Sequence, residues 1–208
     1  MPLDVWLAFV AASTALLLIP GPTVLLVLSY ALSQGKRVAL ASAGGVALGD
    51  FVAMSASLAG LGALVMTSAV AFTVLKWVGA VYLVWLGLKL VIGARNEGMG
   101  PLPAGAAPAR GVFWHAAAVT ALNPKSIAFF IAFVPQFISV GHPLMPQFAL
   151  LIGTFVGLAA VNALAYALLA DRLRVAISRP GVTAWLARGG GAALIGMGVM
   201  TAALRRPA

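Results

Sequence analysis

The amino-acid sequence predicts an all-α polytopic membrane protein with about six transmembrane helices, of which the first and the fourth are broken. Three observations predict this fold class. The 208 residues are 62% hydrophobic and only 8% charged, whereas a soluble domain carries about 25% charged residues. The apolar residues form stretches long enough to cross a bilayer, which takes about 20 residues. Two of these stretches have proline at their centre, in Pro20-Gly21-Pro22 and in Asn123-Pro124.

The composition also excludes several classes of function. The chain has no cysteine and only two, well-separated histidines, His115 and His142. Disulfides, thiolate metal sites and Cys/His catalysis are therefore excluded, and we expect no metal and no cofactor. The net charge is +9, but the basic residues flank apolar spans instead of forming a stripe, so no nucleic-acid partner is expected. Asp4 and the length of the first apolar stretch argue against a cleavable signal peptide.

Hydropathy divides the chain into six predicted spans, which make the lipid bilayer the first expected partner. They are Leu3–Ser33, Val38–Met66, Ala69–Val91, Val112–Ile138, Leu144–Ala170 and Gly189–Leu204. The first is long and interrupted at its centre, as expected for a broken helix. The last is short and begins in a run of three glycines.

Basic residues predict the orientation of these spans, because cytoplasmic loops of membrane proteins are enriched in lysine and arginine. The loops after spans one, three and five carry Lys36, Arg37, Lys89, Arg95, Arg110, Arg172, Arg174, Arg179 and Arg188. The opposite side carries only Lys76, Arg205 and Arg206. The three basic loops are therefore predicted to be cytoplasmic, and both termini are predicted to lie outside the cytoplasm.

The chain is predicted to consist of two three-helix halves. Residues 1–92 form the first, residues 93–111 a cytoplasmic linker rich in Gly, Ala and Pro, and residues 112–208 the second, with an interfacial segment near 171–188. An odd number of spans in each half means that the second repeat must be inverted. The prolines and the Gly-x-x-x-Gly pairs occur in matching order in both halves, namely Pro22, Gly45 and Gly49 in the first and Pro124, Gly153 and Gly157 in the second.

Asp50 lies near the centre of the second span. A charge at this depth costs about 2.5 to 3.5 kcal/mol on insertion scales, so intramembrane acids are usually functional. We interpret Asp50 as a proton carrier or as the ligand of a substrate ammonium group. The alternative is a neutral, hydrogen-bonded aspartate that holds two helices together.

Lys125 lies near the middle of the fourth span, directly after Asn123-Pro124. At this depth the headgroups are about 15 Å away in a hydrocarbon core of about 30 Å, so a snorkelling lysine would fall short of them. Lys125 therefore needs a partner inside the protein. Asp50 and the carboxylate of a substrate are the two candidates.

The two proline motifs predict binding sites at the middle of the membrane. Proline leaves backbone groups unpaired, and lipid cannot satisfy them. The motif Pro20-Gly21-Pro22 gives a half-helix that begins near Thr23, whose N–H groups and positive dipole end suit a carboxylate. A simple kink is the alternative. Beside Pro124, Asn123 bonds either freed carbonyls or a ligand.

Other polar residues and glycines complete the candidate set. Asn162 in span five is expected to form a hydrogen bond between helices. Tyr82 in span three either packs against neighbours or lines a cavity. The glycines of spans two, three and five (Gly45, Gly49, Gly79, Gly87, Gly153 and Gly157) allow close helix packing, either within the chain or in a homodimer.

At these motifs the chain resembles the LysE/RhtB family of amino-acid exporters. The matching stretches, in the family's order, are Pro20-Gly21-Pro22, Gly35-Lys36-Arg37, Gly45-x-x-x-Gly49-Asp50, Lys76-Trp77-x-Gly79-Ala80-x-Tyr82-Leu83, Asn123-Pro124-Lys125 and Phe133-x-Pro135-Gln136-Phe137. The resemblance implies a bacterial inner-membrane protein that exports amino acids or close derivatives in exchange for protons. It also adds Gln136 to the candidate binding residues. The substrate stays open, because members export basic, neutral and hydroxylated amino acids.

The leading hypothesis is therefore a secondary transporter of a small zwitterion that works by alternating access. An exporter of a cation or another small metabolite is the alternative, although one acid at depth without Cys or His is a poor divalent-ion site. An intramembrane enzyme would need paired acids, a His cluster or a Ser/Lys arrangement. Only Ser126 beside Lys125 hints at this, and adjacent helical residues point in different directions.

Overall fold

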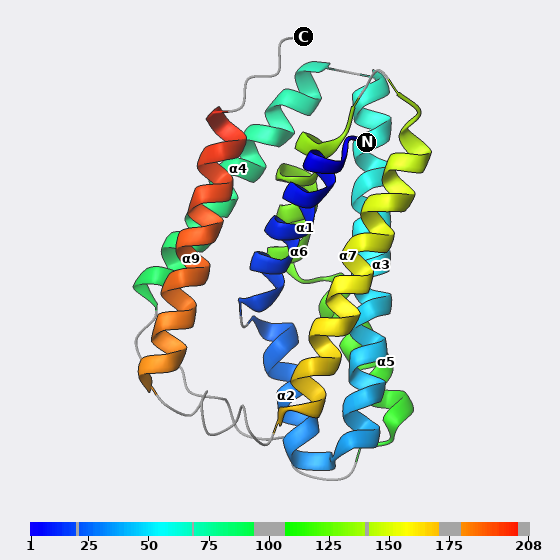
Figure 1. The fold of residues 1–208 in the computed structure, drawn as a ribbon, viewed down its shortest axis with the longest axis vertical. Helices are drawn as coiled ribbons and strands as arrows, with labels where there is room; N and C mark the ends of the chain where they lie inside the picture. The colour runs from blue at the N-terminus through cyan, green and yellow to red at the C-terminus, as the bar shows by residue number, and fades with distance from the viewer. Residues whose placement is uncertain (20, 68, 94–106, 140–141, 171–179, 204–208) are drawn as a thin grey trace.

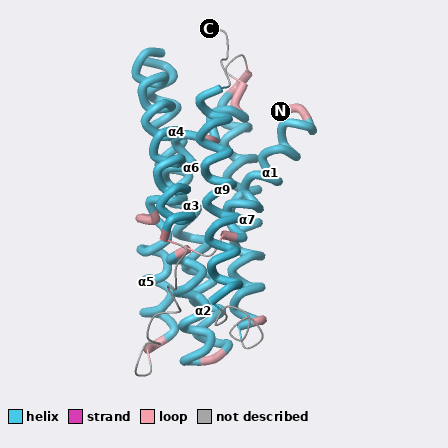
Figure 2. Tube along the Cα trace, turned by 90° about the vertical axis from the view of Figure 1, so that its left-hand side faces the viewer, coloured by secondary structure: helices cyan, strands magenta, loops and turns pink. Residues whose placement is uncertain are grey.

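A computed structural model describes residues 1–19, 21–67, 69–93, 107–139, 142–170 and 180–203. All of the secondary structure in these ranges is helical (Figures 1 and 2). The helices are α1 (Leu3–Leu18), α2 (Pro22–Gln34), α3 (Lys36–Thr67), α4 (Ala69–Ile92), α5 (Ala109–Ala121), α6 (Pro124–Ala132), the short 3-10 helix η1 (Val134–Phe137), α7 (Leu144–Leu168) and α9 (Pro180–Ala203). They run roughly along one axis and form an elongated bundle.

The helix lengths and apolar composition make this a multi-pass membrane protein. Within α3, α4 and α7, the segments Lys36–Ala63, Thr73–Ile92 and Leu144–Leu168 are each long and apolar enough to cross a bilayer. Two bent pairs pass the same test: α1 with α2, bent by 55°, and α5 with α6 and η1, bent by 44°. The two predicted broken spans are therefore present, and up to five spans are identified among the described residues. The sixth span stays a prediction.

The last helix differs from its predicted limits. It begins at Pro180 and continues through the three glycines that were predicted to begin it. Two of these glycines lie against other helices, Gly190 against Ile19 and Gly191 against Gly87 of α4. Tertiary packing thus retains helix where glycine weakens it. The predicted interfacial segment near 171–188 lies partly outside the described residues, and its last part forms the beginning of α9.

Corresponding helices of the two halves run in opposite directions (Figure 1). The α1–α2 pair descends in this view and the α5–α6 pair ascends; α3 ascends and α7 descends, and α4 descends and α9 ascends. This is the arrangement that an inverted repeat requires, although the repeat itself stays a prediction. Most of the predicted linker, residues 94–106, lies outside the described residues.

Glycines set the closest helix contacts. A Cβ atom at Gly45 or Gly49 would meet the backbone of α5, at Phe113 or Ala117, so α3 and α5 approach closely at these positions. The matching pair on α7 is different. Gly153 and Gly157 are exposed and have nothing within 4 Å of an added Cβ. The packing role predicted for them is therefore not met within the described chain, and a homodimer contact there stays a prediction.

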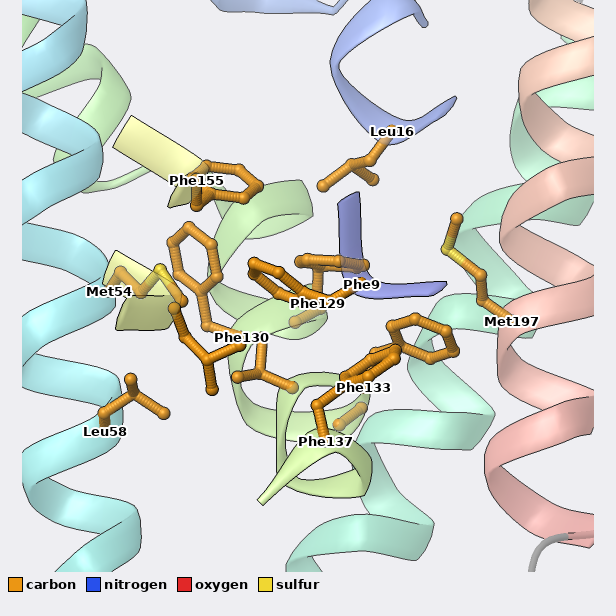
Figure 3. Close-up of a cluster of buried hydrophobic side chains, with 14 of the residues drawn as sticks. Phe9, Leu16, Met54, Leu58, Phe129, Phe130, Phe133, Phe137, Phe155 and Met197 are labelled. Carbon is orange, nitrogen blue, oxygen red and sulfur yellow. The ribbon is translucent and has the colours of Figure 1, made fainter. Parts of the chain in front are cut away.

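The buried side chains form two main cores, one on each side of the helix breaks. The larger contains Phe9 of α1, Phe129, Phe130 and Phe133 of the α6 region and Phe155 of α7 (Figure 3). The smaller lies toward the α2–α3 connection. It contains Val27, Ala39, Ala43, Val46, Ala116, Ala163 and Ala167. The helix breaks therefore lie between the two cores.

Candidate functional site

The first break separates α1 from α2. Helix α1 ends at Leu18 and α2 begins at Pro22, with Gly21 as its extended N-cap residue. Proline is favourable at the first position of a helix, where no intrahelical donor is needed. This agrees with the predicted half-helix starting near Thr23. Pro20 lies outside the described residues.

The second break is held by Asn123. It is the N-cap residue of α6, directly before Pro124, and its Oδ1 accepts a hydrogen bond from the backbone N of Lys125 at 3.0 Å. Its Nδ2 donates to Thr23 Oγ1 of α2 at 3.1 Å. Asn123 thus satisfies a freed N–H group and links the two breaks directly. Of the two predicted partners, a freed carbonyl is not among these bonds, and a ligand stays a prediction.

Lys125 bonds to the end of α1. Its Nζ donates to the carbonyl oxygens of Leu16 at 3.2 Å and Ile19 at 3.1 Å. The predicted partners, Asp50 and a substrate carboxylate, stay predictions, and these two backbone partners are additional to them. The physical reason for the backbone partners is the break itself, because the last carbonyls of a helix lack intrahelical donors. A cation is also favourable at the negative end of a helix.

Two side chains from α7 bond to the same end of α1. Asn162 Nδ2 donates to the carbonyl of Leu17 at 3.1 Å, which is the hydrogen bond between helices that the sequence predicted. The Tyr166 hydroxyl donates to the carbonyl of Leu18 at 3.4 Å. Tyr166 is not among the residues predicted from the sequence. Its spacing of four residues from Asn162 places both on one helix face and was the available signal.

Asp50 lies beside this arrangement on α3 and is 2% exposed. Within the described parts of the chain, no hydrogen-bond donor reaches its Oδ1 atom. A buried oxygen without a donor is costly, so a proton, a water molecule or a cationic group would be favourable at this position.

A cavity joins these groups at the level of the breaks. Its polar lining consists of Thr23, Asp50, Asn123, Lys125, Ser126, Asn162 and Tyr166, and Gly21 also lines it. Its apolar lining consists of Leu16, Leu17, Val24, Val27, Val46, Ala159 and Ala163. The cavity volume of about 30 Å³ accommodates one or two water molecules. An amino acid could enter only if the surrounding helices separate.

Two predicted site residues lie elsewhere. Tyr82 on α4 packs against the larger core and its ring lies 5.4 Å from that of Trp85. Gln136 in η1 donates from Nε2 to Thr201 Oγ1 of α9. Neither lines the cavity. Pro22 and Pro124 begin their half-helices but are not lining residues either. In the described part of the chain, no group of three His, Cys, Asp or Glu side chains could hold a metal ion.

Comparisons with known proteins agree with this architecture. The family model for the LysE type translocator matches residues 14–204. A homoserine/homoserine lactone efflux protein of Salmonella typhimurium is 34% identical over 86% of this chain and 87% of its own length. An uncharacterized membrane protein of Vibrio cholerae is 33% identical over 97% of this chain and 98% of its own.

A leucine efflux protein of Klebsiella pneumoniae is 33% identical, over 65% of this chain and 64% of its own length. This match therefore spans slightly less than two thirds of that relative. No solved structure matches the chain. The family model covers nearly all the helices described above, including both breaks and the cavity between them. This chain belongs to the family of LysE type translocators.

Proposed function

We propose that this protein is a secondary transporter of the bacterial inner membrane. It exports amino acids or close derivatives in exchange for protons, by alternating access. The observation that carries the proposal is the pairing of one carboxylate, Asp50, with one ammonium group, Lys125, around a cavity between two broken helices. Transporters bind small solutes at such breaks, where half-helix ends supply backbone groups. The efflux activities in the names of two relatives support the substrate class.

The charges of the cavity complement those of a zwitterion. An ammonium group has three donors, and two of those of Lys125 are used by α1 carbonyls. The third donor, together with the N–H groups at the start of α2, would hold the substrate carboxylate. Asp50 would hold the substrate ammonium or the transported proton. The hydrogen bonds from Asn123 to Thr23 and from Asn162 to the Leu17 carbonyl keep the helix ends in place around them.

Proton entry would supply the driving force for export. One elementary charge that moves through 100 mV releases about 2.3 kcal/mol, which supports a gradient of about fifty-fold. The small cavity volume supports alternating access. An amino acid does not fit into the cavity as it is, so its entry requires the surrounding helices to separate. The basic ends of α3 and α5 lie at the same end of the bundle (Figure 1). By the positive-inside rule this end would face the cytoplasm and both termini would lie outside.

Counterflow in proteoliposomes tests the transport function. Vesicles loaded with one unlabelled amino acid are diluted into a trace of the same labelled compound, and a panel of amino acids is tested in turn. We expect saturable accumulation of label for one or a few of them. Absence of exchange across the panel, from protein that unfolds cooperatively and is therefore folded, would contradict amino-acid transport.

A further inference from the structure

The cavity has a polar level and an apolar level. Val27 lies one helical turn beyond Thr23 on α2, and Val46 lies one turn before Asp50 on α3. Because α2 and α3 run in opposite directions (Figure 1), both valines are displaced toward the α2–α3 connection. Ala163 of α7 belongs to the same buried cluster as these two valines. The ionisable groups Asp50 and Lys125 thus lie at the helix breaks, and the three aliphatic side chains lie nearer to the α2–α3 connection.

The cavity lining has one acidic side chain, Asp50, and one basic side chain, Lys125. A zwitterionic substrate complements both charges, whereas a substrate with an additional charge does not. The described part of the chain contains two acidic residues, Asp4 and Asp50, and of these two Asp50 alone lines the cavity. A second positive charge on a substrate side chain would enter the apolar level without a counter-charge. Uncompensated charge inside a membrane protein is strongly unfavourable. A second negative charge would face the same difficulty.

From these two observations we infer the substrate class, on the basis of the transport function proposed above. The transported amino acids have uncharged, aliphatic side chains, and the side chain occupies the level formed by Val27, Val46 and Ala163. These three residues determine specificity. In this orientation the substrate ammonium faces Asp50 and its carboxylate faces Lys125, while the side chain points toward the α2–α3 connection.

The first test is a comparison of substrates in the wild-type protein. Counterflow is measured with leucine, lysine and glutamate at equal concentrations. We expect exchange of leucine to exceed that of lysine and of glutamate at least tenfold. Exchange of lysine at the rate of leucine would overturn the inference on substrate class and leave amino-acid transport intact. Exchange of no amino acid at all would instead contradict the proposed function on which the inference rests.

The second test changes the apolar level itself. Val46→Ala enlarges it by two methyl groups, and one methylene in a hydrophobic pocket changes discrimination by about tenfold or more. We expect the ratio of phenylalanine to leucine exchange to rise about tenfold. The matched control is Val52→Ala on the same helix, where the side chain is 48% exposed and lines no part of the cavity. It should leave the ratio unchanged. An unchanged ratio in Val46→Ala, or an equal rise in both variants, would overturn the placement of the side chain.

Discussion

The end of α1 is satisfied by side chains from two other helices. The last carbonyls of a helix have no donors of their own, and lipid supplies none at this depth. Lys125 bonds to the carbonyls of Leu16 and Ile19, while Asn162 and Tyr166 of α7 bond to the two carbonyls between them. Lys125 therefore stabilises the end of α1 at the break, in addition to its proposed contact with substrate.

Substitution of Lys125 should reduce stability as well as transport. Lys125→Met removes two charge-assisted hydrogen bonds, which costs about 2 to 3 kcal/mol. The Ile19 carbonyl loses its Lys125 donor, whereas the Leu16 carbonyl keeps the backbone N–H of Ile19. The measurement is unfolding in detergent, followed by circular dichroism. Lys89→Met is the matched control, because Lys89 is exposed in the last turn of α4 and lies over the ring of Trp85. Equal stability of the two variants would contradict the structural role of Lys125.

At this scale the sequence predicts which residues lie near the breaks better than it predicts their hydrogen-bond partners. The depth of Asp50 and Lys125 follows from the span limits, and both line one cavity. The bonds of Lys125 to α1 could not be predicted, because they depend on how α6 packs against α1 across more than 100 residues of chain. Tertiary packing determines which donor lies within hydrogen-bond distance of a freed carbonyl.

At the scale of elements, proline predicted where half-helices begin, whereas glycine predicted close packing at Gly45 and Gly49 but not at Gly153 and Gly157. Pro22 and Pro124 each occupy the first position of a half-helix, because proline cannot continue a helix but can begin one. Glycine permits both close packing and helix termination. The glycines at 189–191 were interpreted as a boundary, yet α9 continues through them because it packs closely against α4.

The two Gly-x-x-x-Gly pairs should respond oppositely to substitution by alanine. A Cβ at Gly49 would lie 2.5 Å from the carbonyl oxygen of Ala117, so Gly49→Ala should lower the free energy of unfolding by about 1 to 3 kcal/mol. Gly153→Ala should raise it by about 0.5 to 1 kcal/mol, because alanine favours helix and meets no neighbour. Unfolding of the two variants under one set of detergent conditions checks this. Destabilisation by Gly153→Ala would show that α7 has a contact partner at this face.

At the scale of the whole molecule, the cavity lies at the junction of the two cores. Leu16 and Ala159 belong to the larger core, while Val27, Val46 and Ala163 belong to the smaller one. We propose that alternating access uses a relative movement of the two cores, which opens the cavity between them. Breaks in α1–α2 and α5–α6 at the same level provide the positions where such a movement can occur.

The orientation in the membrane can be tested with single cysteines, because the natural chain has none. Arg37 lies in the first turn of α3 and His142 lies just before α7, and both are exposed. In intact cells, a membrane-impermeant maleimide that reaches the periplasm should label His142→Cys. It should label Arg37→Cys only after the inner membrane is permeabilised. The reverse pattern would mean that the termini lie in the cytoplasm.

Proton coupling through Asp50 is tested most directly by efflux from proteoliposomes loaded with a transported amino acid. An acid-outside gradient is imposed on vesicles that contain wild-type protein, Asp50→Asn or the control Asp4→Asn. Asp4 is exposed in the first turn of α1, far from the cavity lining. We predict that the gradient accelerates efflux by the wild type and by Asp4→Asn, and leaves efflux by folded Asp50→Asn unchanged. Equal acceleration in all three proteins would remove Asp50 from the coupling mechanism.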